Sequence, residues 1–304
     1  MFYTRLWGVR GSIPTPGPAT VVYGGNTACV EIRADKRLLI VDLGTGAKPL
    51  GDWLLANELK EHPLEADIFV THTHWDHIMG FPMFSPIFIP STKLKMWGSV
   101  SYDGDSLEKV IGVQLSYQYW PIRLNELSAH IEYGELKQEE AIDLGGGLGL
   151  STKYLNHPVL CLGYRFEYQG KSIVTAFDTE PFYNVFPTNK DDPAYNEEAA
   201  REGEQVAESE NQQVLNFIKG ADILIYDSQY TQEEYKQHIG WGHSSYQTAI
   251  GHALKAGVKK LICFHHDPGR SDEELAALEA EFRQRYASEP LEIIIGREGM
   301  TIEA

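Results

Sequence analysis

Short apolar runs recur along the whole chain, and most are bounded by residues that favour turns. Such runs predict buried strands. They place strands at residues 2–7, 28–32, 38–41, 68–70, 94–98, 148–155, 161–168, 171–176, 222–226 and 259–264, with a closing hairpin of 291–295 and 300–302. Helical patterns follow at 48–58, 107–114, 246–256 and 272–286. Strands that alternate with helices indicate an α/β sandwich.

The chain of 304 residues is expected to form a single domain over residues 1–304, with inserted segments at about 99–140 and 181–212. Between Pro181 and Glu210 acidic residues far outnumber Lys and Arg. We interpret this stretch as a solvated surface excursion, with a flexible lid or a dimer contact as alternatives. A homodimer is therefore a possible assembly.

The formal net charge of −17 repels extended polyanions, so long nucleic acid is not an expected partner. The three cysteines, Cys29, Cys161 and Cys263, lie far apart beside apolar residues and are expected to be reduced core residues. The chain start lacks the apolar region of a signal peptide, and no run is long enough to span a membrane. We therefore expect a cytoplasmic protein that does not enter membranes.

Candidate chemistry is concentrated just after the strand at 68–70, where the sequence continues Thr71-His72-Thr73-His74-Trp75-Asp76-His77. His72 and His74 are two residues apart on an extended exit and project to the same side, so one metal ion can take both. If a helix begins just beyond, Asp76 and His77 lie in its first turn and reach a second metal. Imidazole and carboxylate groups this close together in the sequence suit zinc, iron or manganese as ligands.

This His-x-His-x-Asp-His motif resembles the defining motif of the metallo-β-lactamase superfamily, and the likeness extends along most of the chain. The phosphodiesterase branch, which includes tRNase Z and the phosphoribosyl cyclic phosphodiesterases, is the most similar. The resemblance implies a four-layer αβ/βα sandwich with its site along one edge of the paired sheets.

The resemblance also implies a set of metal ligands at successive strand ends. His72, His74, His157 and Asp178 are expected to hold the first of two divalent metal ions, and Asp76, His77, His265 and the shared Asp178 the second. His266 is the rival of His265 for the last position. Zinc is the favoured metal, with manganese or iron as alternatives.

Two further residues match catalytic positions of the phosphodiesterase branch. Asp227 follows a buried strand, and His243 lies in a His-Ser-Ser turn before a helix. The resemblance implies that Asp227 orients His243, which acts as the general acid toward the leaving oxygen, while Asp76 orients the attacking water. A metal-bridged hydroxide is the expected nucleophile. In tRNase Z a glutamate occupies the position of Asp227.

Three residues are candidates for substrate binding, each with a structural alternative. Asn26, in a Gly-Gly-Asn turn, is expected near the metals, although a plain turn explains it equally. Arg270 offers a clamp for a phosphate oxygen, with an exposed surface arginine as the alternative. Trp120, in an aromatic cluster, offers a stacking wall, although such aromatics also belong to cores.

The sequence thus predicts a metal-dependent hydrolase, a dinuclear phosphodiesterase that acts on a small or cyclic phosphodiester such as a cyclic nucleotide or ribosyl cyclic phosphate. No basic arm that grips tRNA is recognisable. The alternatives are a thioester or lactam hydrolase of the glyoxalase II type, which has no need of Asp227 and His243, and a non-catalytic di-iron sensing module. The sensor commonly has glutamate where this chain has His74.

Overall fold

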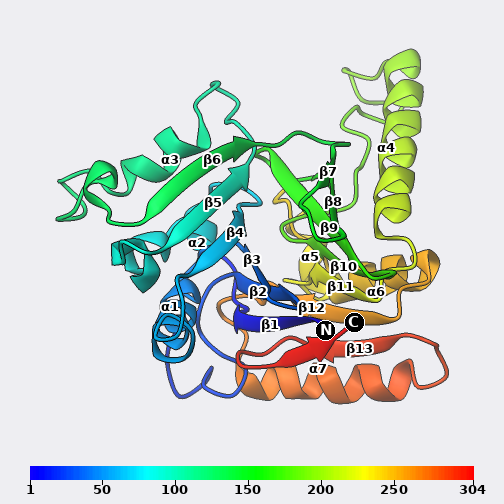
Figure 1. Cartoon of the computed structure of the whole chain (residues 1–304). Helices are drawn as coiled ribbons and strands as arrows, with labels where there is room; N and C mark the ends of the chain where they lie inside the picture. Colours follow the sequence, from blue (N-terminus) through cyan, green and yellow to red (C-terminus); the bar gives the residue numbers. More distant parts are fainter.

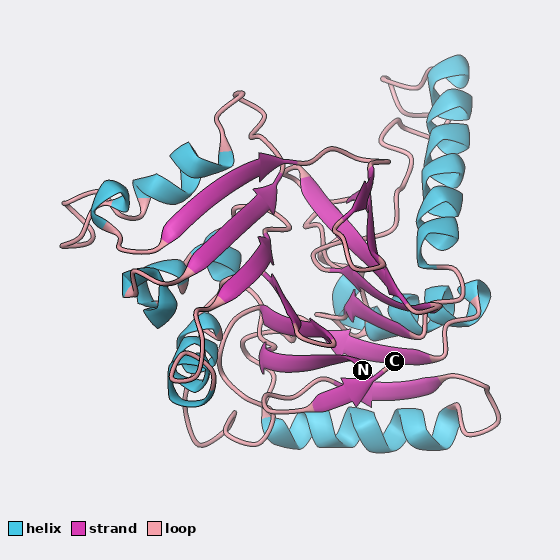
Figure 2. Cartoon of the chain, in the orientation of Figure 1, coloured by secondary structure: helices cyan, strands magenta, loops and turns pink.

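Two seven-stranded sheets face each other, and helices cover their outer faces, in the computed structural model, which describes residues 1–304 (Figures 1 and 2). The first sheet has the order β14-β1-β2-β3-β4-β5-β6 and the second β13-β12-β11-β10-β9-β8-β7. The first comprises β1 Phe2–Gly8, β2 Cys29–Ala34, β3 Arg37–Val41, β4 Glu65–Phe69, β5 Lys93–Gly98, β6 His130–Glu135 and β14 Thr301–Glu303. The second comprises β7 Ala141–Asp143, β8 Leu148–Leu155, β9 Cys161–Tyr168, β10 Lys171–Ala176, β11 Ile223–Asp227, β12 Lys260–Phe264 and β13 Glu292–Ile295.

The helices lie outside the two sheets and complete four layers, which confirms the expected fold class. They are α1 Ala47–Asn57, α2 Trp75–Ile78, α3 Leu107–Val113, α4 Glu197–Ile218, α5 Gln232–Tyr235, α6 Tyr246–Ala256 and α7 Asp272–Arg285, with short 3-10 turns η1 Phe81–Met83, η2 Ser85–Phe88 and η3 Leu124–Glu126. No helix combines the length and the apolar character needed to cross a membrane.

Strand β11 shows how the layers are built from alternating side chains. Ile223 and Ile225 belong to the core between the sheets, whereas Leu224 and Tyr226 belong to the core between the second sheet and its helices. All four are buried because both faces of the strand are covered. This double burial explains why the central strands read as continuous apolar runs in the sequence.

The last two strands do not form the expected hairpin. β13 pairs in parallel with β12, with Ile295 opposite Cys263, and β14 pairs antiparallel with β1, with Glu303 opposite Tyr3. The prediction was wrong because each short strand completes the edge of a different sheet. The connection between them crosses from one sheet to the other.

The two segments expected as insertions have different structures. The first contains α3, η3 and β6, and β6 is hydrogen-bonded along β5 as the edge strand of the first sheet. The second consists of a loop and most of α4, which projects beyond the sheets at one side (Figure 1). Only Ala207, Val214 and Ile218 of α4 are buried. The division into one domain with two insertions stays a prediction.

Backbone strain marks the strand ends that face one another across the two sheets. Asp42 after β3, Asp178 after β10 and His265 after β12 have φ of 60°, 46° and 62°. Residues other than glycine rarely adopt this left-handed conformation, and it persists where the surroundings enforce it. The strained positions therefore point to the place where side-chain chemistry is concentrated.

A buried tyrosine joins the second sheet to the segment after β4. The hydroxyl of Tyr164 on β9 donates to the Val70 carbonyl at 2.6 Å, and Leu162 N–H donates to the Thr71 carbonyl at 2.9 Å. Tyr164 is fully buried.

Tyr164→Phe is expected to lower the free energy of unfolding by about 1 kcal/mol, because the Val70 carbonyl loses a buried donor. Urea denaturation measures this difference. Tyr154→Phe is the control, since that hydroxyl contacts only Ser99 at a part-buried position. A Tyr164→Phe protein as stable as the parent contradicts the structural role.

Candidate metal centre

Seven of the side chains singled out above converge where the two sheets present their strand ends. They form two clusters, in each of which the potential ligand atoms lie within 4.8 Å of one another. The first contains His72, His74, His157 and Asp178, and the second Asp76, His77, His265 and the same Asp178. The structure thus groups these residues as expected, and their role as metal ligands stays a prediction.

The motif residues reach the site through a tight exit from β4. His74 is extended at the N-cap of α2, with φ −63° and ψ 149°. α2 begins at Trp75, so Asp76 and His77 lie in its first turn, as expected. Asp76 is placed where a helix N-terminus favours negative charge, and Ser12 N–H donates to its Oδ2 at 2.7 Å.

Four of the imidazoles are fixed by acceptors behind them. His77 Nδ1 donates to Asp42 Oδ2 at 2.7 Å, His157 Nδ1 to the Gly242 carbonyl at 3.0 Å, His265 Nδ1 to Gln229 Oε1 at 2.9 Å, and His72 Nδ1 lies 3.1 Å from Thr71 Oγ1. With its proton on Nδ1, a neutral imidazole presents the Nε2 lone pair to the cluster.

The Nε2 atoms of these imidazoles meet around Asp178. His77 Nε2 lies 3.3 Å from His265 Nε2, and Asp178 Oδ1 lies 3.1 Å from the former and 3.2 Å from the latter. His72 Nε2 and Asp178 Oδ1 are buried without a hydrogen-bond partner. Unpartnered buried polar atoms are costly, and a cation satisfies all of them at once. The donor set therefore fits divalent metal ions.

The electrostatics of the clusters also favour a cation. Burial lowers the pKa of His157 to about 4, which leaves that imidazole neutral. Burial also opposes charge on His77, but the carboxylates around it, Asp178 first, raise its pKa well above the usual value. Burial would raise the pKa of Asp178, yet His265 and His77 lower it, so this carboxyl stays ionised. Negative charge without a Lys or Arg partner is thus concentrated here.

Asp42 is a residue of the site that the sequence analysis did not single out. Its fully buried carboxylate accepts from His77 Nδ1 and from the Thr71 N–H and hydroxyl, at 2.7, 2.7 and 2.8 Å. It orients a candidate ligand from behind. The available signal was its position, since Asp42 ends a buried strand next to the motif strand, as Asp178 ends β10.

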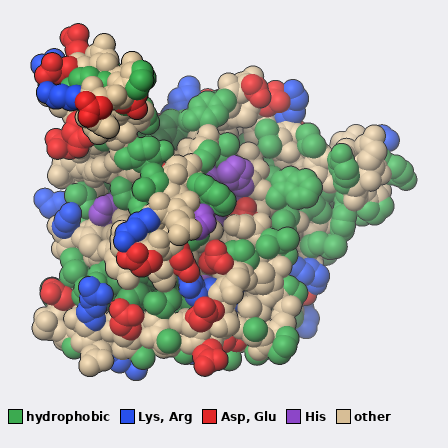
Figure 3. Space-filling view, turned by 180° about the vertical axis from the view of Figure 1, so that it is seen from behind, with side chains coloured by type: hydrophobic (Ala, Val, Ile, Leu, Met, Phe, Trp, Pro, Cys, Tyr) green, Lys and Arg blue, Asp and Glu red, His purple; other side chains and the backbone are tan.

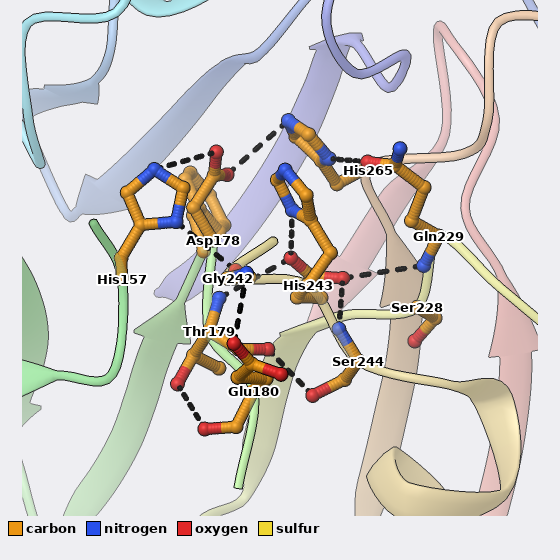
Figure 4. Close-up of polar contacts among 12 residues, drawn as sticks. His157, Asp178, Thr179, Glu180, Ser228, Gln229, Gly242, His243, Ser244 and His265 are labelled. Atoms are coloured by element: carbon orange, nitrogen blue, oxygen red, sulfur yellow. Dashed lines mark hydrogen bonds and ion pairs between the residues drawn. The ribbon is translucent and has the colours of Figure 1, made fainter. Parts of the chain in front are cut away.

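His243 lies beside Asp178 and His265 (Figure 4), and potential ligand atoms of His243, Asp227, Asp178 and His265 lie within 4.8 Å of one another. His243 Nδ1 donates to Asp227 Oδ2 at 2.8 Å, and the ring is stacked on His265 with centroids 4.8 Å apart. Asp227 also accepts the N–H groups of Thr179 and Ser244, at 3.2 and 3.1 Å. Burial would lower the pKa of His243, but the Asp227 carboxylate raises it to about 9. The imidazole is therefore held as a proton donor.

Glu180 fixes the loop between α5 and α6 that carries His243. Its carboxylate, 4% exposed, accepts the N–H groups of Gly240 and Gly242 at 3.0 Å each. The Gly242 carbonyl in turn accepts from His157 Nδ1 (Figure 4). Any side chain at position 242 would collide with His157, because a Cβ there would lie 2.3 Å from Nδ1. One carboxylate thus positions backbone next to both a candidate ligand and the catalytic candidate.

The structure distinguishes His265 from His266. His266 is fully buried away from both clusters, where its Nε2 donates to the Gly296 carbonyl at 2.8 Å and its Nδ1 lies 3.3 Å from the Tyr246 hydroxyl. His265 is the one whose Nε2 faces Asp76 and Asp178.

Two of the substrate-binding candidates have partners within the protein, and their role toward a substrate stays a prediction. The Asn26 side chain donates to Glu298 Oε2 at 3.0 Å, across its turn. The Arg270 guanidinium donates to Glu234 Oε2 at 2.6 Å. Arg270 is only 9% exposed, so it is not an exposed surface arginine.

Trp120 does not border the clusters. It packs against the core between the first sheet and its helices, and its indole nitrogen is buried. Of the two interpretations of this aromatic segment, the structure supports the core.

Asp42→Asn is expected to weaken metal affinity about 10- to 100-fold, because the partner that orients His77 loses its charge. Competition against a chelator measures the affinity. Asp52→Asn is the matched control, since Asp52 is exposed and paired with Lys48. Unchanged affinity in a folded Asp42→Asn protein contradicts this role.

Comparison with known proteins agrees with the motif. Residues 22–163 match the family described as the metallo-beta-lactamase superfamily. The ribonuclease Z of Thermoplasma volcanium is 27% identical over 312 aligned positions, which cover 94% of each chain. The ribonuclease Z of Exiguobacterium sibiricum is 27% identical over 290 positions, which cover 86% of this chain and 89% of the relative.

Solved structures share the fold. The metallo-beta-lactamase fold protein YhfI from Bacillus subtilis has a TM-score of 0.67 at 17% identity and covers 100% of this chain and 99% of its own. The short form of human tRNase Z has a TM-score of 0.63 at 16% identity, with 99% and 98% covered. A diphosphatase from the PhnP family scores 0.62 at 16% identity, with 100% and 98% covered. Residues 22–163 thus match the metallo-beta-lactamase superfamily, and the paired sheets share the fold of these solved structures.

Proposed function

We propose that the protein is a dinuclear metal-dependent hydrolase that acts on phosphodiesters. The observation that carries this proposal is the Asp227–His243 pair, stacked against His265 beside the two ligand clusters. A thioester hydrolase needs metal ligands but no such proton donor, because a thiolate is a weaker base than an alkoxide and leaves without a proton.

In this proposal the seven clustered side chains hold two divalent ions, with Asp178 common to both. When bound, the ions lower the pKa of a shared water and offset the negative charge of the phosphodiester oxygens. We favour zinc, because it is commonly bound by four ligands that include imidazoles and carboxylates. Manganese or iron are the alternatives.

The chain's own residues then divide the remaining tasks. His243 donates a hydrogen bond from Nδ1 to Asp227, while its other ring nitrogen is turned away from that carboxylate toward Asp178 and His265 (Figure 4). From there it donates a proton to the departing oxygen. Asp76, held by Ser12 N–H, orients the attacking water.

For the substrate we propose a small or cyclic phosphodiester. The net charge of −17 opposes a long polyanion, and no Lys or Arg contacts the seven clustered side chains. The curated relatives are named ribonuclease Z, so an RNA phosphodiester is the second candidate.

His243→Ala is expected to lower kcat for a chromogenic diester, bis(p-nitrophenyl) phosphate, by about 10²- to 10⁴-fold. Bound metal should stay unchanged, because in this proposal His243 donates a proton and does not bind the metal. Steady-state kinetics on metal-quantified protein measures both.

His62→Ala, at an exposed position, is the control and should keep the parental rate. Loss of metal in the His243→Ala protein would make His243 a ligand. Turnover of a thioester that is indifferent to the same change would instead support a hydrolase of the glyoxalase II type.

A further inference from the structure

Four large side chains with apolar surface border the candidate metal centre and stay in solvent. They are Ile13, Trp75, Tyr183 and Trp241, with exposed fractions of 56, 75, 43 and 60%. We call this set the apolar rim. Figure 3 shows histidine side chains (purple) at the surface, next to hydrophobic side chains (green). Two tryptophans left this exposed next to one site point to a ligand with its own apolar surface.

One side of the apolar rim is attached to the histidine motif. Trp75 is the residue between His74 and Asp76 and opens α2. Ile13 follows Ser12, whose N–H donates to Asp76 at 2.7 Å. Both side chains are therefore anchored through backbone that touches the candidate ligands.

The other side is attached to the loop that carries His243. Trp241 directly precedes Gly242, whose carbonyl holds His157. Its indole meets His238 edge-on with centroids 4.8 Å apart, and His238 is stacked on Tyr230 at 4.4 Å. These contacts hold the indole in place.

Tyr183 belongs to the segment that leads to α4, and it lies close to the same loop. Its hydroxyl is 3.1 Å from the point that a Cβ on Gly240 would occupy. The apolar rim thus draws on four separate stretches of chain.

The two tryptophans are linked by a short path of contacts across the first cluster. His74 Nδ1 lies 3.0 Å from His157 Nε2, and His157 Nδ1 donates to Gly242 at 3.0 Å. Trp75 and Trp241 are the neighbours in sequence at the two ends of this path. Both tryptophans are thus attached through the backbone to residues that contact His157.

Two arginines near the candidate site already have partners. The nearby guanidinium of Arg270 is paired with Glu234, and Arg10 is fully buried and donates to the carbonyls of Gly24 and Arg270. A polynucleotide is held mainly through its phosphates by Lys and Arg, whereas a single base is held by stacking.

From this geometry, and resting on the proposed function, we propose that Trp75 and Trp241 stack a nucleobase carried by a small phosphodiester substrate. The apolar rim then selects the planar aromatic substituent, while the clusters engage the phosphorus. The proposed substrate class is therefore a diester of a single nucleotide.

The test compares the binding of adenosine 5′-monophosphate and ribose 5-phosphate to the metal-loaded protein by calorimetry. The two ligands share a sugar and a phosphate and differ in the base. The parent protein should bind the nucleotide about tenfold or more tightly, as stacking of one base implies. Trp75→Ala and Trp241→Ala should each reduce this preference, and Trp75→Phe should retain most of it.

Tyr119→Ala is the matched control, because Tyr119 is 75% exposed but lies in the segment next to Trp120, away from the clusters. Equal affinity for the two ligands, or no measurable binding of either, overturns the proposal. So does a dimer that forms with rising concentration and is lost in Trp241→Ala, since the apolar rim would then join two copies.

The outcome is separable from that of the proposed function. Base preference without diester turnover leaves the apolar rim in place and refutes the phosphodiesterase. Diester turnover without base preference supports the phosphodiesterase and refutes the stacking role of the apolar rim.

Discussion

The rest of the site depends on a buried carboxylate, Asp178, placed where the two sheets come together. It is 1% exposed and shared by both clusters of candidate ligands. A buried charge is tolerated only when it is paired or coordinated, and here its neighbours are imidazoles and not Lys or Arg. The fold therefore concentrates a charge that a bound cation compensates, and the surrounding histidines are oriented as if for that cation.

The same constraint explains where the backbone is strained. Asp42, Asp178 and His265 adopt left-handed backbone at the ends of three strands, two of them in the second sheet and one in the first. Burial on both faces of these strands keeps the residues in place despite the strain. Side chains that would otherwise continue along the strand are turned into the space between the sheets.

Around this centre, a network of hydrogen bonds links groups that come from distant parts of the sequence. Glu180 positions the loop of His243, and the Gly242 carbonyl in that loop orients His157. Disturbance of one catalytic element is thus transmitted to another. Outside the network the apolar rim replaces the basic surface expected of a protein that grips a polyanion. Charge inside the site and apolar surface around it are complementary features of one small binding site.

The sequence by itself determined which residues gather at the candidate site, because the metal motif is local and the remaining candidates follow apolar runs that mark strand ends. His72, His74, Asp76 and His77 needed only the spacing of one strand and one helix turn. The layered fold followed equally from runs long enough to be buried on both faces.

Only the tertiary structure decided what depends on register and on contacts across the sheets. Adjacent residues at a strand end point to opposite faces, so the choice between His265 and His266 rests on pairing that the sequence does not show. Asp42, at the end of another strand, accepts a hydrogen bond from His77. Glu298 and Glu234 accept hydrogen bonds from Asn26 and Arg270, which lie in distant segments. Such partners are brought together only by folding. Residues far apart in the chain leave no local sequence pattern that would reveal the contact.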